Sequence, residues 1–311
     1  MDPPIRLRDF IEDKDGWLYA VSTYDNRDRV GCVLRYIPYP GGERMRTDGK
    51  RYRKLDFEEA YTLIECSKPG YANVVQRVPI VDVVRVYKPE EEILSACTRN
   101  EKVRNLVDLF TLPKGTFGCT GSFLCGLETP SSDIDLVVYG KAWFAAQKQL
   151  QERIEGGQIN DLSLEMWRRV FTKREPAIPF EVFVLHEKRK WNRGEIEGTY
   201  FDLLYTRSYE DLDMEPMIRG KVIDRRCICA RVIDASLAYD SPAIYEVEHE
   251  EITRVLSFTH TYSGQARKGE FIEAKGVCEK HGEEYWLVVG TSRVAPDEYI
   301  ISHTLLEEHL K

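Results

Sequence analysis

The stretch Gly-Cys-Thr-Gly-Ser-Phe-Leu-Cys-Gly-Leu-Glu-Thr-Pro-Ser-Ser-Asp-Ile-Asp-Leu-Val-Val-Tyr-Gly, residues 118–140, decides the fold. It places a glycine-serine turn, Gly121 and Ser122, ahead of an acid pair, Asp133 and Asp135, which opens an apolar run at 136–139. The run predicts a buried strand. Because side chains alternate along a strand, both carboxylates share one face while Ile134 enters the core.

Two carboxylates this close repel each other unless a cation lies between them. Oxygen-only ligands suit Mg²⁺, with Mn²⁺ as the alternative, and paired metal ions suit phosphoryl or nucleotidyl transfer. The sequence therefore predicts that Asp133 and Asp135 are metal ligands and catalytic residues.

The glycine-serine element predicts the phosphate-binding half of such a site. Residues 116–120 indicate a strand, Gly121 a tight turn, and residues 122–127 the start of a short helix. A helix amino terminus preceded by glycine presents backbone N–H groups to an anion. Gly121 would let the backbone approach a phosphate, and the Ser122 hydroxyl would donate to it.

At these residues the chain resembles the DNA polymerase beta-like nucleotidyltransferase superfamily, whose signature is Gly-Ser followed by Asp-x-Asp on the next strand. It is most similar to the archaeal members known as predicted nucleotidyltransferases, over residues 89–220. The resemblance implies a small mixed sheet flanked by helices, and transfer of a nucleoside monophosphate (NMP) from a nucleoside triphosphate (NTP) to an acceptor. It also implies that Ser122 contacts the triphosphate and that Asp133 and Asp135 hold the metals.

The superfamily usually has a third carboxylate on a later strand, for which the sequence offers two candidates. Asp202 lies within the apolar run 200–205, and Glu181 lies within the apolar run 180–185; both runs are predicted strands. An unpaired charge in such a strand is costly. We favour Asp202, with Glu181 as the alternative. A structural interpretation also stays open: either acid could sit at a sheet edge, paired with an arginine.

A basic cluster with one aromatic residue occupies residues 186–194, between these candidates. Lys190 and Arg193 are predicted to bind the triphosphate or a nucleic-acid phosphate, and Trp191 to stack on a base. Charge runs are usually solvated loops, and that alternative is left open.

Composition places the chain among ordinary globular proteins. Its 311 residues, 42% hydrophobic and 31% charged, suffice for two or three domains. No apolar stretch approaches a membrane span and the amino terminus lacks signal-peptide features, so we expect a cytoplasmic protein. Eight scattered cysteines without a Cys-x-x-Cys pair argue against a disulfide framework or structural zinc.

Charge distribution bears on the acceptor. The net charge of −8 counts against general coating of nucleic acid. Residues 44–54, however, contain six basic residues and one acid, which predicts either a local nucleic-acid contact or a mobile hairpin loop.

Three regions are expected, in an α+β fold. Residues 1–88 form a β-rich amino-terminal domain, with a hairpin of 17–23 and 30–37 and a helix capped by Asp56. Residues 89–222 form the central mixed-sheet nucleotidyltransferase domain, with helices at 90–110, 141–155 and 164–171. Residues 223–311 form a small β-barrel or sandwich.

The predicted function is metal-dependent transfer of an NMP from an NTP, with RNA as the expected acceptor. Asp202, or failing it Glu181, would help to deprotonate the acceptor hydroxyl. One alternative is a noncatalytic module of this fold that binds nucleic acid or protein. Another is an enzyme that nucleotidylates a protein or a small molecule.

Overall fold

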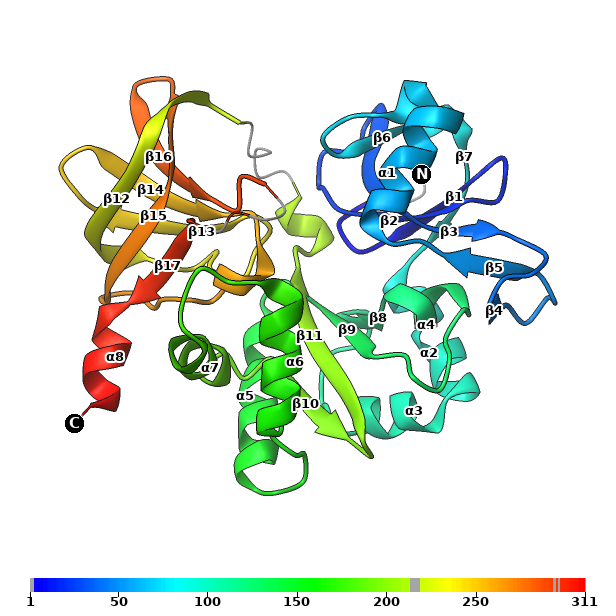
Figure 1. Ribbon diagram of the computed structural model, residues 1–311. Helices are drawn as coiled ribbons and strands as arrows, with labels where there is room; N and C mark the ends of the chain where they lie inside the picture. Colours follow the sequence, from blue (N-terminus) through cyan, green and yellow to red (C-terminus); the bar gives the residue numbers. More distant parts are fainter. Residues whose placement is uncertain (1–2, 213–218, 293–294, 296, 311) are drawn as a thin grey trace. The chain divides into compact units, whose positions relative to one another are not determined.

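The computed structural model describes residues 3–212, 219–292, 295 and 297–310 (Figure 1). The chain forms two compact units. The first contains Met1–Asp161 and Asn192–Pro216, and the second contains Leu162–Trp191 and Met217–Lys311. Helices and strands are mixed throughout, which confirms the α+β class. The first two sheets fall within the regions expected from the sequence, and the third begins at Lys221, two residues before the expected boundary at 223. The independence of these regions as domains stays a prediction.

The amino-terminal sheet of the first unit has seven strands, in the order β4-β5-β3-β2-β1-β7, with β6 paired to β3. Helix α1 (Phe57–Ser67) begins with the predicted capping box of Asp56 and Glu59, and its Ala60 and Ile64 pack into the core. The antiparallel β2–β3 pair confirms the predicted hairpin. The strands are β1 (Phe10–Asp13), β2 (Leu18–Val21), β3 (Arg29–Pro38), β4 (Arg44–Met45), β5 (Arg51–Lys54), β6 (Gln76–Pro79) and β7 (Val83–Tyr87).

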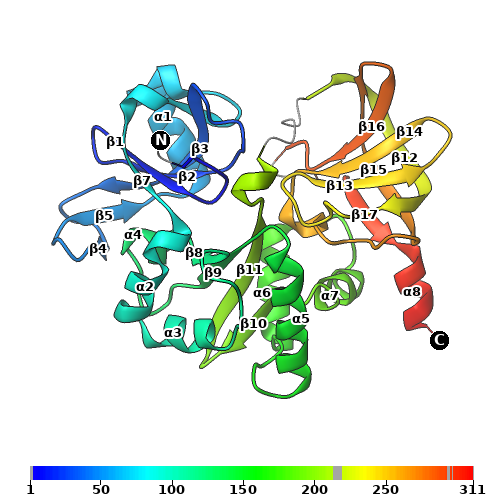
Figure 2. The same ribbon diagram turned by 180° about the vertical axis from the view of Figure 1, so that it is seen from behind.

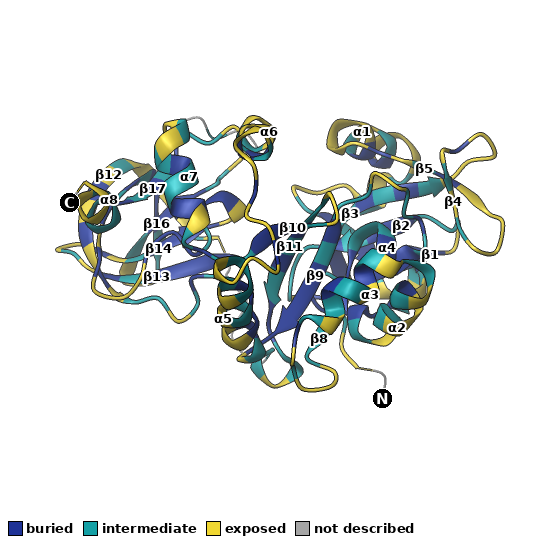
Figure 3. Cartoon of the chain, turned by 90° about the horizontal axis from the view of Figure 1, so that it is seen from below, coloured by how far each residue is buried: buried dark blue, intermediate teal, exposed yellow. Residues whose placement is uncertain are grey.

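The central sheet of the first unit is mixed, with the order β10-β11-β9-β8. Strand β9 pairs parallel to β11 and antiparallel to β8, and it is buried along most of its length (Figure 3). The strands are β8 (Phe117–Cys119), β9 (Ile134–Tyr139), β10 (Arg193–Ile196) and β11 (Thr199–Thr206). The motif thus lies on adjacent strands of the small mixed sheet that the resemblance implied.

One predicted helix of the central region is interrupted in the structure. The continuous helix expected at 90–110 is two helices, α2 (Pro89–Arg99) and α3 (Glu101–Asp108), seen from behind in Figure 2. Asn100 interrupts them because its backbone is extended and its side chain accepts a hydrogen bond from Val103 N at 3.1 Å, which caps α3. Helix α5 (Ala142–Glu155) forms as predicted, with Trp143, Ala146 and Leu150 buried.

The second unit is a β-barrel with helices. Its strand order is β12-β13-β14-β16-β15-β17, and an additional β12–β15 pairing closes the ring. Of the two architectures that the sequence left open, barrel and sandwich, the closed ring is a barrel. The strands are β12 (Lys221–Asp234), β13 (Ala243–Glu248), β14 (Ile252–Ser257), β15 (Phe271–His281), β16 (Glu284–Val289) and β17 (Tyr299–Ser302). The helices are α6 (Leu164–Arg174), α7 (Phe180–Lys188) and α8 (His303–His309). Within the described ranges, no helix combines the length and apolar character needed to cross a bilayer.

Candidate active site

The acid pair stands where β9 begins. Asp133 immediately precedes the strand and Asp135 is its second residue; both are partly exposed, whereas Ile134 between them is fully buried. The alternation predicted from the sequence is therefore present. The backbone of Thr120 donates to the Asp135 carbonyl at 2.9 Å, which fixes the end of β8 against the start of β9.

Gly121 of the glycine-serine turn packs closely against Asp135. Gly121 has φ +68°, a conformation that L side chains rarely adopt, and a Cβ built there would lie 2.9 Å from Oδ2 of Asp135. Only glycine lets the backbone come this close to the carboxylate. Ser122 follows, partly exposed, in the short helix α4 (Gly121–Cys125), whose next three residues are buried.

A third carboxylate lies beside the pair. Strand β11 runs parallel to β9 with Asp202 in register with Asp135, so the two side chains share one face of the sheet. Oδ1 of Asp202 accepts a hydrogen bond from the Tyr200 hydroxyl at 2.8 Å and lies 3.6 Å from Nε of Arg193. Arg193 is opposite Asp202 in the antiparallel β10–β11 pair. The arginine partner that the structural interpretation anticipated is thus present on the edge strand β10, but Asp202 itself lies on the interior strand β11 and not at the sheet edge.

The donor set suits a metal that arrives with its substrate. Among the residues that the structure describes, no group of three or more histidine, cysteine, aspartate or glutamate side chains is arranged to hold a metal ion by itself. Mg²⁺ in nucleotide sites is usually bound by one or two carboxylates together with substrate phosphates. Asp133 and Asp135 provide two carboxylates, and the Gly121 backbone packs beside them.

Comparison with known proteins agrees with this geometry. A family model described as a nucleotidyltransferase domain matches residues 99–192, which include the whole motif. A protein of Methanocaldococcus jannaschii, named as the uncharacterized protein MJ1086, is 34% identical over 334 residues, covering 95% of this chain and 98% of the relative. The chain belongs to the nucleotidyltransferase family. No solved structure matches it significantly.

Membership gives the reaction class. A nucleotidyltransferase domain supports transfer of an NMP from an NTP, and such domains generally use a divalent metal. The chain is accordingly a transferase.

Glu181, the alternative third carboxylate of this nucleotidyltransferase, lies in a different setting from the one expected. Residues 180–185 are not a strand but the start of α7, so the strand prediction is wrong. Glu181 is exposed in the first turn of that helix, within the second unit. Proline at 179 and the edge-on packing of Phe183 against Phe171 of α6, at 5.4 Å between ring centroids, accompany the helical conformation.

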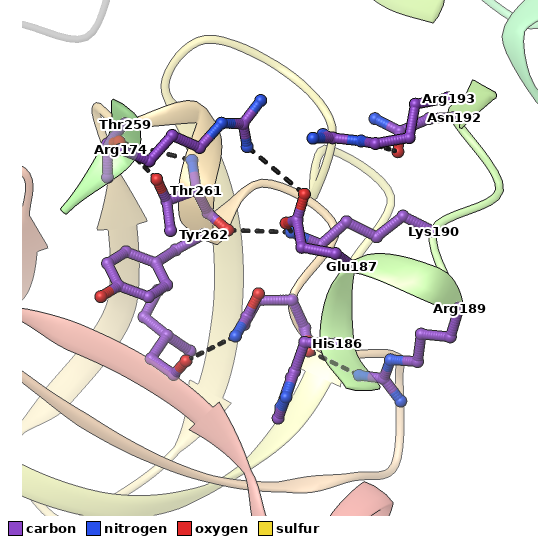
Figure 4. Close-up of polar contacts among 12 residues, drawn as sticks. Arg174, His186, Glu187, Arg189, Lys190, Asn192, Arg193, Thr259, Thr261 and Tyr262 are labelled. Carbon is purple, nitrogen blue, oxygen red and sulfur yellow. Dashed lines mark hydrogen bonds and ion pairs between the residues drawn. The ribbon is translucent and has the colours of Figure 1, made fainter. Parts of the chain in front are cut away.

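The basic cluster at 186–194 is divided between the two units. Lys190 belongs to the second unit, where its fully buried ammonium group pairs with Glu187 and donates to the Thr261 carbonyl at 2.8 Å (Figure 4). Glu187 also accepts from Arg174. These contacts show that Lys190 has a structural role; phosphate binding by this residue stays a prediction.

Arg193 belongs to the first unit and lies on β10, beside Asp202. Its side chain is 4% exposed and contacts Asp202, as described above, and Oδ1 of Asn192 at 3.4 Å. Trp191 has a positive φ of 46°, so the chain turns sharply just before this strand. Arg193 is thus a predicted phosphate-binding cation that lies in the sheet carrying the acids.

One contact was missed by the sequence reasoning. The Tyr200 hydroxyl donates a hydrogen bond to Asp202. The sequence signal for this contact is that Tyr200 precedes Asp202 by two residues on one strand, and residues i and i+2 share a face.

Proposed function

We propose that this protein is a metal-dependent nucleotidyltransferase that moves an NMP from an NTP to an RNA acceptor. The observation that carries the proposal is the register of Asp202 with Asp135, at the point where Gly121 packs against the Asp135 carboxylate. Nucleotidyl transfer requires a backbone turn that a phosphate can approach and a set of acids close to it. Here the acids are carried by two adjacent strands and the residue that precedes one of them.

Each group has a distinct task in the reaction. Asp133 and Asp135 hold Mg²⁺ or Mn²⁺, which when bound neutralises charge on the transferring phosphoryl group. The Gly121 backbone and the Ser122 hydroxyl bind the β- and γ-phosphates. Arg193, on the neighbouring strand, adds positive charge on the side of the acids. Lys190 has no assigned task here, since its buried pair with Glu187 already engages its charge.

The transfer step involves Asp202. An acceptor hydroxyl oxygen attacks the α-phosphorus, the bond from that phosphorus to the bridging oxygen breaks, and pyrophosphate leaves. Tyr200 and Arg193 both contact Oδ1 of Asp202, and we assign Oδ2 as the oxygen that receives the hydroxyl proton. The hydrogen bond from Tyr200 helps to hold the carboxylate in position.

The RNA acceptor is supported by surface charge and by fold. The β4–β5 hairpin presents the exposed cations Lys50, Arg51 and Lys54. The second unit is a small closed barrel, an architecture that includes oligonucleotide-binding folds. The second argument is an analogy of fold and weighs less than the first.

A panel of labelled NTPs tests the proposal. The protein is incubated with Mg²⁺ or Mn²⁺ and each NTP, with total RNA, with a protein lysate, or with small hydroxyl-bearing acceptors. Label on RNA supports the proposal as stated. Label only on protein or on small molecules keeps the transferase and replaces the acceptor. An absence of both incorporation and metal-dependent NTP binding would leave the noncatalytic module as the better account.

A further inference from the structure

We propose that Arg44, in the amino-terminal sheet, is a positioning residue for Asp133; the inference rests on the proposed function. Nη1 of Arg44 donates to the Leu127 carbonyl at 2.9 Å and to the Ser132 hydroxyl at 3.1 Å. Its side chain is 12% exposed, so these contacts are largely shielded from water. The two acceptors flank the loop that leads from α4 to the acid pair.

That loop forms a compact turn. The Ser132 hydroxyl accepts from Thr129 N at 2.9 Å, and Ser132 N donates to the Thr129 carbonyl at 2.9 Å. Arg44 joins Leu127, two residues before the turn, to Ser132, its last residue, and Asp133 is the next residue in the chain. The guanidinium group therefore fixes the direction in which the chain enters β9, and with it the position of the Asp133 carboxylate.

The other end of the same connection is also tied to the amino-terminal region. The hydroxyl of Thr120, which immediately precedes Gly121, donates to the carbonyl of Arg8 at 2.7 Å. Arg8 has φ +74°, an uncommon conformation for a residue with a side chain. Contacts from residues 8 and 44 thus hold both ends of the segment that carries the proposed phosphate-binding turn.

The other cations of the hairpin make different contacts. Lys50 is exposed and its hydrogen bond to Asp48 is made by its backbone, whereas the side chain of Arg46 pairs with Asp48 and with Tyr87. Residues 44–54 therefore combine two largely shielded arginines, Arg44 and Arg46, with exposed cations such as Lys50, and of the shielded pair it is Arg44 that donates to the loop. Lys50 provides a matched control, because its removal deletes one charge from the same hairpin without touching the loop.

The test measures loop protection and metal-dependent NTP binding in Arg44→Ala, Arg44→Lys, Ser132→Ala and Lys50→Ala. For Arg44→Ala we expect faster hydrogen exchange at amides 128–133. We also expect the Mg²⁺ concentration for half-maximal NTP binding, measured by calorimetry without acceptor, to rise about tenfold, as the loss of a charge-assisted hydrogen bond implies. Lys50→Ala should match the wild type in both measurements.

The variants at the two partners identify the contact. Arg44→Lys should recover part of the metal dependence, since an ammonium group can donate to one acceptor. Ser132→Ala should shift the metal dependence in the same direction, and combining it with Arg44→Ala should add less than the sum of the single effects. If Arg44→Ala does not fold, the single variants Arg44→Lys and Ser132→Ala decide whether Arg44 positions Asp133.

Failure of the inference and failure of the proposed function are distinguishable. A folded Arg44→Ala protein with wild-type exchange at 128–133 and wild-type metal dependence overturns the positioning role while the transferase stands. A wild-type protein that binds no NTP with metal overturns the proposed function. In that case the proposed role of Arg44 in positioning a metal ligand is overturned as well. The hydrogen-exchange data still show whether Arg44 orders the loop.

Discussion

Asp202 on β11 lies beside Asp135 on β9, at matching positions of two parallel strands. Neighbouring strands of a sheet are about 4.8 Å apart, so the two carboxyl groups on the shared face are near neighbours. The spacing along the chain does not predict that Asp135 and Asp202 are adjacent, because a long segment separates them. It makes Asp202 the third carboxylate of the proposed site and gives the mechanism its base.

Replacing Asp202 by asparagine should therefore reduce turnover and spare substrate binding. We expect turnover to fall about 10²- to 10⁴-fold, the range for loss of a general base, with little change in the NTP dissociation constant. Asparagine keeps an oxygen for the Tyr200 hydrogen bond, so the sheet should stay intact. Glu181→Gln, on the exposed first turn of α7, is the control and should behave as wild type. Kinetics in which only Glu181→Gln loses turnover would reverse the assignment.

A pair of glycine substitutions separates backbone strain from disturbance of the site. Gly121 and Gly157 both have positive φ, +68° and +70°, but a Cβ at Gly157 has nothing within 4 Å whereas one at Gly121 approaches Asp135. Gly121→Ala and Gly157→Ala should each lower the free energy of unfolding by about 1–2 kcal/mol. Only Gly121→Ala should also weaken metal-dependent NTP binding, measured by calorimetry. Equal binding in the two variants would remove Gly121 from the site.

The stability of the second unit should depend on pH through His186. Burial lowers the pKa of this imidazole from 6.5 to about 4. Its Nδ1 lies 2.8 Å from the Val182 carbonyl and its Nε2 accepts from Ser302 N at 2.9 Å, a pattern that fits the neutral ring. Protonation would place a second N–H group against the Ser302 N–H group.

The sign follows from the lowered pKa. Above pH 6.5 His186 is neutral in both the folded and the unfolded chain, and its contribution is fully present. As the pH falls from 6.5 towards 4, the unfolded chain takes up the proton first, so the free energy of unfolding should drop by up to about 3 kcal/mol. Denaturant titrations between pH 7.5 and 5 measure this slope. His186→Gln should flatten it, and the same change at the exposed His309 should not; an unchanged slope in His186→Gln would contradict the assignment.

The sequence predicted the part of the site that is local. Side-chain alternation placed Asp133 and Asp135 on one face, and the Gly121-Ser122 turn precedes them as expected. The capping residue Asp56 likewise identified the start of α1, because both residues of a capping box lie within one short segment of sequence. These features depend on spacing along one segment, which the sequence contains directly.

Glu181 shows where the local sequence pattern misleads. A short apolar run such as 180–185 fits a buried strand or a buried helix face equally well, and here packing against α6 accompanies the helix. At the end of α7, Glu187 and Lys190 stand three residues apart and pair, a contact that the prediction for residues 186–194 did not include. The contact of Arg44 with the loop before Asp133 is long-range, and no pattern in residues 44–54 distinguishes it from a surface cation.

The most direct measurement compares the wild type with Asp135→Asn for incorporation of labelled NMP from each NTP into RNA, in the presence of Mg²⁺. The substitution preserves the size of the side chain and removes one carboxylate charge, and the free energy of unfolding is measured alongside to show that the variant is folded. We predict incorporation by the wild type and its loss by at least about 10³-fold in a folded Asp135→Asn protein. Equal incorporation by the two proteins, or equal incorporation with and without metal chelator, would contradict a metal-dependent transfer centred on these acids.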